Sequence, residues 1–319
     1  MSEADLGPRR RSSRAAASGG IHYPRWLWPS LAAPATVYLL VLFIAPLLVI
    51  LAVTFGTVSP ILRTPVPVWN PLDWNTGVMA FTISNLTHSD GLYFASFIRT
   101  IGYVSVATFL CLLIGYPFAY FMARHAGRAK GLFLVAFFAP FWISYMLRML
   151  AWVSLLQDNG YVNQILGGLG IIGEPYPWLA GKPVTLILGL TYGYVPFMIL
   201  PLYAALDRIP SALLEASRDL GASPARTFRK ITLPQSRQAI LAGVIIAGLP
   251  MFGDYFTQQL LANSDNTLML GNFVIDSLSV PIFMSRGSAL ILVMMAMMFV
   301  PVVYYLRSTR RAALLRPIR

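Results

Sequence analysis

Six long apolar runs dominate this sequence and limit the folds that it can adopt. Each approaches the roughly 20 residues that an α-helix needs to cross a bilayer, and in lipid only helices or closed barrels satisfy the backbone. Charged residues make up 11% of the 319 residues, against about a quarter in soluble domains. We therefore predict an all-α membrane protein with six transmembrane helices, at Ala35–Phe55, Phe97–Met122, Leu132–Leu156, Val184–Leu206, Ala239–Leu261 and Ala289–Leu306.

The basic residues alternate sharply between the two sides of this six-helix arrangement. Of the 24 lysines and arginines, 19 fall before the first helix, after the last helix, or in the second and fourth connections. Positive residues accumulate in cytoplasmic loops, so we expect both termini in the cytoplasm. A net charge of +12 that is spread in this way indicates membrane orientation and argues against nucleic-acid binding.

The chain offers little that suggests an enzyme. Its one cysteine, Cys111, lies in an apolar run and has no disulfide partner, and the three histidines are scattered. No phosphate-binding pattern G-x-x-x-x-G-K-[ST] occurs. We expect no metal, no bound cofactor and no ATPase site of its own.

Four regions follow from these patterns. Residues 1–30 form a disordered cytoplasmic tail with an aromatic anchor at the membrane interface, and residues 31–92 hold the first helix and a long outer loop. The first helix is too long and begins too late to be a cleaved leader, so we expect it to be retained. Residues 93–306 form the core, with a polar insert at 207–236, and residues 307–319 are a basic tail.

The polar insert contains the stretch EASRDLGASPARTFRKITLP, which has the signals of two short helices. The first begins near Pro210 and ends at Gly221, since glycine suits the left-handed residue after a helix. Ser223 and Pro224 are typical of an N-cap and first helical position. We expect Pro234 to end the second helix.

This insert resembles the EAA loop of ATP-binding cassette (ABC) importer permeases. The spacing of that family is kept throughout, and the one departure is a serine for the second alanine. The resemblance implies that the segment docks into a cytoplasmic ATPase and couples ATP hydrolysis to the membrane helices. The residues that carry this implied coupling role are Glu215, Ala216, Ser217, Leu220, Gly221, Ile231, Leu233 and Pro234.

The same resemblance implies a type I importer permease fold and a set of partners. These are a second permease, expected to be a paralogue, two copies of an ABC ATPase that hydrolyse ATP with Mg²⁺, and an extracytoplasmic solute-binding protein. The implied mechanism is alternating access. An ATPase-independent channel or secondary carrier would leave the docking segment without a role.

Two further stretches resemble the spermidine/putrescine branch of this family, PFWISYMLRMLAWVSLLQDNGYVNQIL from Pro140 and GDYFTQQLL from Gly253. The loop that follows departs from the branch, because ANSDN stands where a pair of glycines is usual. A polyamine is the solute that this resemblance implies, with ferric iron, sulfate or thiosulfate, and thiamine as alternatives.

Ionisable residues inside a membrane normally face a partner or a pathway. Asp254 and Arg148 lie at similar depths in predicted helices, so they either pair with each other or contact the solute. In the second case Asp254 would bind a cation together with Trp152, Tyr194 and Tyr255, whose rings suit an ammonium group.

Overall fold

The computed structural model describes residues 26–314, and the chain divides into two compact units, residues 1–48 and 49–319. The predicted N-terminal tail up to residue 25 and the last five residues lie outside the described part. The first unit contributes most of one helix, α1 (Leu27–Thr54), whose side chains are largely exposed. An exposed apolar helix of this kind is what a bilayer surrounds.

The second unit consists almost entirely of helices. The only strands among the described residues, β1 (Thr57–Val58) and β2 (Pro65–Val66), pair antiparallel in the predicted outer loop. The α-helices of this unit are α2 (Gly77–Thr87), α3 (Phe94–Arg124), α4 (Lys130–Phe138), α5 (Tyr145–Leu156), α6 (Tyr161–Gly168), α7 (Pro183–Asp207), α8 (Ser211–Asp219), α9 (Pro224–Thr227), α10 (Leu233–Phe252), α11 (Phe256–Leu261), α12 (Leu270–Ser279) and α13 (Met284–Leu314). The shorter turns are η1 (Pro71–Asp73), η2 (Gly127–Ala129), η3 (Ala139–Trp142), η4 (Phe228–Thr232), η5 (Asp265–Thr267) and η6 (Pro281–Phe283).

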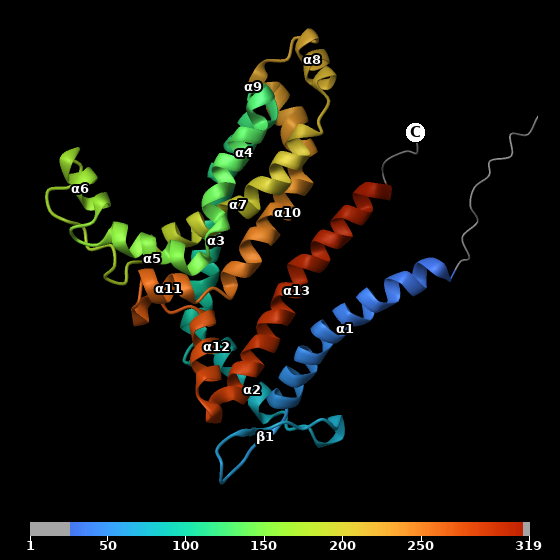
Figure 1. Ribbon diagram of the computed structural model, residues 1–319, viewed down its shortest axis with the longest axis vertical. Helices are drawn as coiled ribbons and strands as arrows, with labels where there is room; N and C mark the ends of the chain where they lie inside the picture. Colours follow the sequence, from blue (N-terminus) through green and yellow to red (C-terminus); the bar gives the residue numbers. More distant parts are fainter. Residues whose placement is uncertain (1–25, 315–319) are drawn as a thin grey trace, which may run out of the picture. The chain divides into compact units, whose positions relative to one another are not determined.

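The main core lies where α3, α7 and α10 run side by side (Figure 1). Met198 of α7 is fully buried at its centre. A Cβ atom at Gly115 of α3 would lie 3.2 Å from the Met198 side chain, and one at Gly243 of α10 would lie 2.6 Å from its sulfur. Small residues therefore let both neighbours approach α7 closely, as is usual where helices pack in membranes.

Four of the described helices are long and apolar enough to cross a membrane, and there are five if one bent pair counts as a single span. The four are Ser30–Thr54, Phe94–Arg124, Pro183–Asp207 and Pro281–Arg310, each overlapping a predicted span. The structure thus bears out a multi-helix membrane chain, whereas the count of six stays a prediction.

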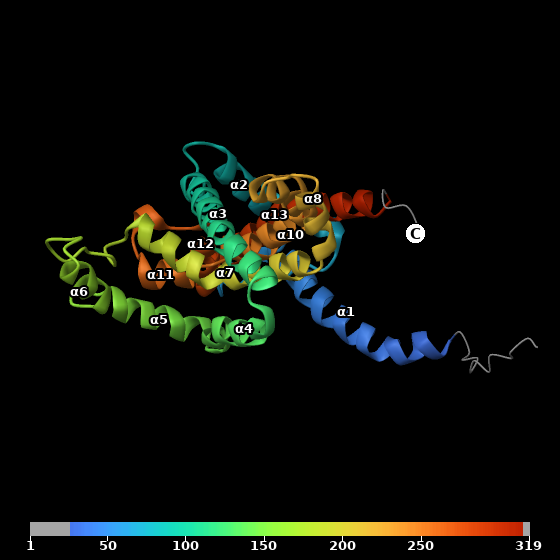
Figure 2. The same ribbon diagram turned by 90° about the horizontal axis from the view of Figure 1, so that it is seen from above.

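The predicted continuous helix Leu132–Leu156 is wrong, because the chain turns by 88° between η3 and α5. Pro140 lies in η3, and Ile143 and Ser144 are extended. Proline cannot continue the helical hydrogen-bond ladder, and the chain restarts as α5 at Tyr145. Figure 1 shows this turn, and Figure 2 shows α6 at the far end of α5.

The predicted helix Ala239–Leu261 is also interrupted. α10 ends at Phe252, and Gly253, Asp254 and Tyr255 form a break before α11 begins at Phe256. The Asp254 side chain accepts the backbone N–H of Thr257 at 2.9 Å, which is one of the free N–H groups in the first turn of the second piece. The break places the Asp254 carboxylate between two helical segments, where it can bind groups from neighbouring helices.

Candidate functional site

The polar insert folds as the two short helices that its sequence predicts. α8 ends in a left-handed residue, Gly221, with φ of 79°. The N–H of Gly221 bonds to the Arg218 carbonyl at 2.8 Å, and the N–H of Ala222 bonds to the Ser217 carbonyl at 3.1 Å. This pair of bonds is the Schellman motif, which turns the chain sharply at the tip of the insert.

The second helix begins as predicted but does not end as predicted. The Ser223 hydroxyl accepts the N–H of Arg226 at 3.3 Å, and Pro224 opens α9. The break expected at Pro234 is wrong, since α9 continues through the π-helical turn η4 into α10. The Leu233 N–H bonds to the Phe228 carbonyl five residues earlier. The wider π turn accommodates a proline that has no N–H to donate.

The predicted coupling residues divide into an exposed group and a group at the entry to α10. Glu215, Ala216 and Gly221 are exposed, and the Leu220 side chain at the tip is 89% exposed. Ile231 is half-buried, whereas Leu233 and Pro234 are exposed on α10. The tip of the insert therefore presents an apolar side chain to solvent, and the coupling role of these residues stays a prediction.

Aromatic contacts fasten the insert to the core. The Phe228 ring meets the rings of Tyr116 and Tyr120 on α3 edge-on, with centroids 5.7 and 5.8 Å apart. The Tyr116 hydroxyl also lies 2.9 Å from the Ser236 hydroxyl of α10. The Arg124 guanidinium of α3 donates to the carbonyls of Leu206, at the end of α7, and Ile209, just before α8. Contacts with α3 thus hold the insert at both of its ends.

A second candidate site surrounds Asp254, whose side chain is 6% exposed. Its Oδ2 atom accepts hydroxyl hydrogen bonds from Tyr145 of α5 at 2.6 Å, Tyr194 of α7 at 3.1 Å and Thr257 of α11 at 2.6 Å. Its Oδ1 atom accepts the Thr257 N–H. One carboxylate thus joins three helices, an arrangement that we call the Asp254 node, made of Asp254, Tyr145, Tyr194 and Thr257.

A glycine makes room for this node. A Cβ atom at Gly193 would lie 2.7 Å from Cε2 and 2.9 Å from the hydroxyl of Tyr145. Both distances are shorter than carbon contacts allow. The Tyr145 ring therefore reaches Asp254 only because residue 193 has no side chain.

Arg148 does not pair with Asp254; the one salt bridge among residues 26–314 joins Lys130 to Asp207. The guanidinium carbon of Arg148 lies over the rings of Phe141, Tyr145 and Tyr192, at 4.5, 5.4 and 5.8 Å from their centroids. The buried Nε and Nη1 atoms have no hydrogen-bond partner among the described residues. Aromatic faces stabilise the charge instead.

The other two predicted solute-path residues lie outside the Asp254 node. Trp152 packs against Tyr192 with ring centroids 5.2 Å apart. Tyr255 stacks on Phe256 and lines an apolar pocket of about 270 Å³. Of the five residues predicted for the solute path, the structure brings only Asp254 and Tyr194 into direct contact.

Sequence reasoning missed Tyr145 and Thr257. Thr257 had a local signal, because it stands three residues after Asp254, the spacing of an N-cap and its acceptor bond. Tyr145 had none, since its partner is 109 residues away.

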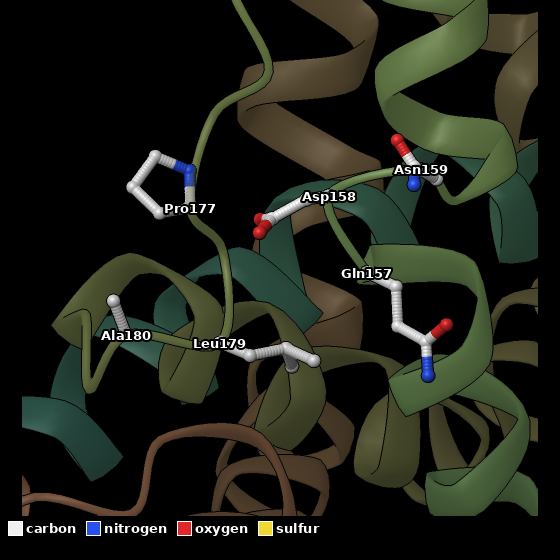
Figure 3. Close-up of a pocket in the computed structure, with 6 residues that line it drawn as sticks. All are labelled: Gln157, Asp158, Asn159, Pro177, Leu179 and Ala180. Atoms are coloured by element: carbon white, nitrogen blue, oxygen red, sulfur yellow. The ribbon is translucent and has the colours of Figure 1, made fainter.

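A pocket of about 430 Å³ with a mixed polar and apolar lining opens where α5 ends, and the sequence did not predict it. Figure 3 shows the Asp158 carboxylate pointing toward Pro177. The lining residues are Gln157, Asp158, Asn159, Pro177, Leu179 and Ala180. The pocket shares no residue with the Asp254 node or the polar insert.

Comparison with known proteins connects these features to one family. Residues 115–313 match the family described as "Binding-protein-dependent transport system inner membrane component". The spermidine/putrescine transport system permease protein PotB of Escherichia coli K12 is 36% identical over 197 residues, which is 61% of this chain and 71% of the relative. PotB of Haemophilus influenzae is 32% identical over 230 residues, covering 72% of this chain and 80% of the relative.

Solved structures agree on the fold. A bacterial ABC transporter involved in the import of alginate covers 90% of this chain and 96% of its own, with a TM-score of 0.62 and 19% identity. The alginate transporter in complex with an alginate-bound periplasmic protein gives a TM-score of 0.61 at 17% identity, covering 90% and 95%. The family match spans the polar insert, the Asp254 node and most of α13. This chain belongs to the binding-protein-dependent inner membrane components, the permease subunits of ABC importers.

Proposed function

We propose that this chain forms, with a second permease, the membrane path for a polyamine such as spermidine or putrescine. The relatives named as spermidine/putrescine permeases support the solute class. The second permease is a paralogue, and an extracytoplasmic binding protein delivers the solute. Catalysis is assigned to two copies of a cytoplasmic ABC ATPase, which bind ATP and Mg²⁺.

One observation carries the coupling role: a rigid, exposed two-helix insert that is fastened to the membrane helices. Leu220 and Glu215 face outward from it, and Phe228 ties it to α3. An exposed apolar side chain at the tip and an exposed carboxylate on the same helix suit insertion into a cleft of a partner protein. Closure of the two ATPases would move both docked inserts and thereby open the path outward.

The Asp254 node supports a role in the path that is mainly architectural. Its carboxylate already accepts four hydrogen bonds, so a solute ammonium would have to displace a hydroxyl donor. We assign Asp254 to holding α5, α7 and α11 together, with the aromatic rings of Tyr194 and Trp152 facing the path.

The test of function is ATPase activity of the reconstituted complex with its binding protein, across putrescine, spermidine, ferric iron, sulfate, thiamine and a sugar. Stimulation by polyamines alone is the expected result. Stimulation by sulfate or iron would keep the permease role and refute the polyamine assignment. Solute flux without any ATPase would refute the importer.

The coupling role has its own test in proteoliposomes. Glu215→Lys is expected to reduce ATP-driven uptake more than tenfold while the protein stays in the membrane. Asp90→Lys, the same charge reversal at an exposed residue of the predicted outer loop, is the matched control and should transport normally. Equal uptake by both variants would refute docking through α8.

A further inference from the structure

One hydrogen bond ties the two helices of the insert together through their side chains. The hydroxyls of Ser217 on α8 and Thr227 on α9 lie 2.7 Å apart. In the part of the chain that the structure describes, no other side-chain hydrogen bond joins these two helices. Ser217 stands at the one position where the insert departs from the E-A-A pattern.

The two partners differ in their access to water. Thr227 is 5% exposed, whereas Ser217 is only half-buried. A buried hydroxyl that loses its partner pays the full desolvation penalty, but a hydroxyl that water can reach does not. Losing the Ser217 hydroxyl should therefore cost more than losing the Thr227 hydroxyl.

Thr227 also stands at the junction between the docking helix and the core. The next residue, Phe228, contacts the two α3 tyrosines, and the backbone continues through η4 into α10. The Ser217–Thr227 bond is thus the polar connection between the exposed helix α8 and the segment that leads into the membrane. Gly221 fixes the turn between the helices, and α8 can pack closely on α9 only while the buried Thr227 hydroxyl has a partner.

We propose that Ser217 and Thr227 are a positioning pair that sets the angle of α8 and thereby the efficiency with which ATP hydrolysis drives transport. The inference rests on the proposed coupling function of the insert. Neither residue needs to touch the ATPase, because the pair acts through the orientation of α8, which presents Glu215 and Leu220.

The different burial of the two partners gives an unusual set of expected results. Ser217→Ala, although it restores the alanine of the family pattern, should reduce solute uptake per ATP hydrolysed by about fivefold or more. It leaves the buried Thr227 hydroxyl unpaired, and this hydroxyl reaches water only if α8 tilts away from α9. Thr227→Val should stay close to wild type. The double variant Ser217→Ala with Thr227→Val should recover, because replacing both partners with apolar groups is nearly neutral.

The measurement is uptake and ATP hydrolysis in the same proteoliposomes, with ATPase, second permease and binding protein present. A pair that positions α8 changes the ratio of solute to ATP, whereas a variant that merely folds poorly lowers both rates together. Failure of the double variant to recover, or a wild-type ratio in Ser217→Ala, would overturn the inference.

A second readout needs no transport. Nitroxide labels are attached to cysteines that replace Ala212 and Ala225, exposed residues on α8 and α9, in a Cys111→Ser background. Dipolar broadening gives the distance between the labels, which changes with the angle between the helices. The distance distribution should widen in Ser217→Ala and narrow again in the double variant. Unchanged distances refute the positioning pair even if transport works, whereas absence of ATP-driven uptake in the wild type refutes the proposed function and leaves this readout valid.

Discussion

Removing the Tyr145 hydroxyl tests the Asp254 node most directly. Tyr145→Phe keeps the ring that lies beside Gly193 and under Arg148. It deletes the hydroxyl, which donates to Oδ2 of Asp254 at 2.6 Å and also lies 2.5 Å from the Thr257 hydroxyl. Three donations to the carboxylate remain, from Tyr194 and Thr257. The variant therefore removes the hydroxyl contacts of α5 with Asp254 and Thr257 and leaves the rest of the node in place.

The size of the effect follows from the kind of bond. A hydrogen bond to a charged group contributes about 1.5–3 kcal/mol to stability, and the short distance favours the middle of that range. Unfolding entropy of roughly 2.1 cal/mol/K per residue converts about 2 kcal/mol into a fall of about 3 °C in Tm for a chain of this length. Tyr194→Phe, whose bond is longer at 3.1 Å, should lower Tm by less.

The assay is thermal unfolding of the purified permease in detergent, followed by tryptophan fluorescence. Tyr192→Phe is the matched control, since within the described residues the Tyr192 ring makes only aromatic and cation–π contacts. A Tm for Tyr145→Phe equal to that of Tyr192→Phe would refute the bond to Asp254. A larger loss in Tyr194→Phe than in Tyr145→Phe would refute the order of the two contacts.

Two further substitutions probe the same region. Gly193→Ala should destabilise the protein by about 1–3 kcal/mol, because the new Cβ displaces the Tyr145 ring. In a Tyr145→Ala background the same glycine substitution should cost little, and additive losses of Tm would contradict the clash. Asp254→Asn should lower Tm by several degrees, since its amide offers a donor where four donors converge, and should slow uptake of putrescine. A lowered Tm with unchanged KM and rate for uptake would confine Asp254 to holding the helices.

The parts of the fold that depend on neighbouring residues could be predicted from the sequence. Gly221 ends α8 with positive φ, and Ser223 and Pro224 start α9, because such motifs are satisfied within one turn of backbone. The long apolar helices follow from composition alone. These features needed no knowledge of the rest of the molecule.

The breaks and the Asp254 node could not be predicted in the same way. Hydropathy counts the residues around Ser144 and Gly253 as continuous apolar runs, although the backbone leaves the helix at both places. Pro234 was expected to break a helix, yet a π turn accommodates it. Asp254 was expected either to pair with Arg148 or to contact the solute. The pairing is wrong, because the partners of Asp254 include hydroxyls brought together by tertiary packing and the Arg148 charge lies over aromatic rings, whereas the solute contact stays a prediction.

The π turn η4, which precedes Pro234, also joins two helices into one long lever. Because α9, η4 and α10 follow one another without a break, the backbone from Pro224 to Phe252 is a single arm roughly 40 Å long. Pivoting such an arm by about 5° sweeps its far end through about 3.5 Å. Asp254 stands two residues beyond the end of this arm. The displacement exceeds the 2.6 Å between the Thr257 hydroxyl and Oδ2 of Asp254. A small rotation of the lever at the docking end would therefore displace its other end far enough to exchange hydrogen-bond partners.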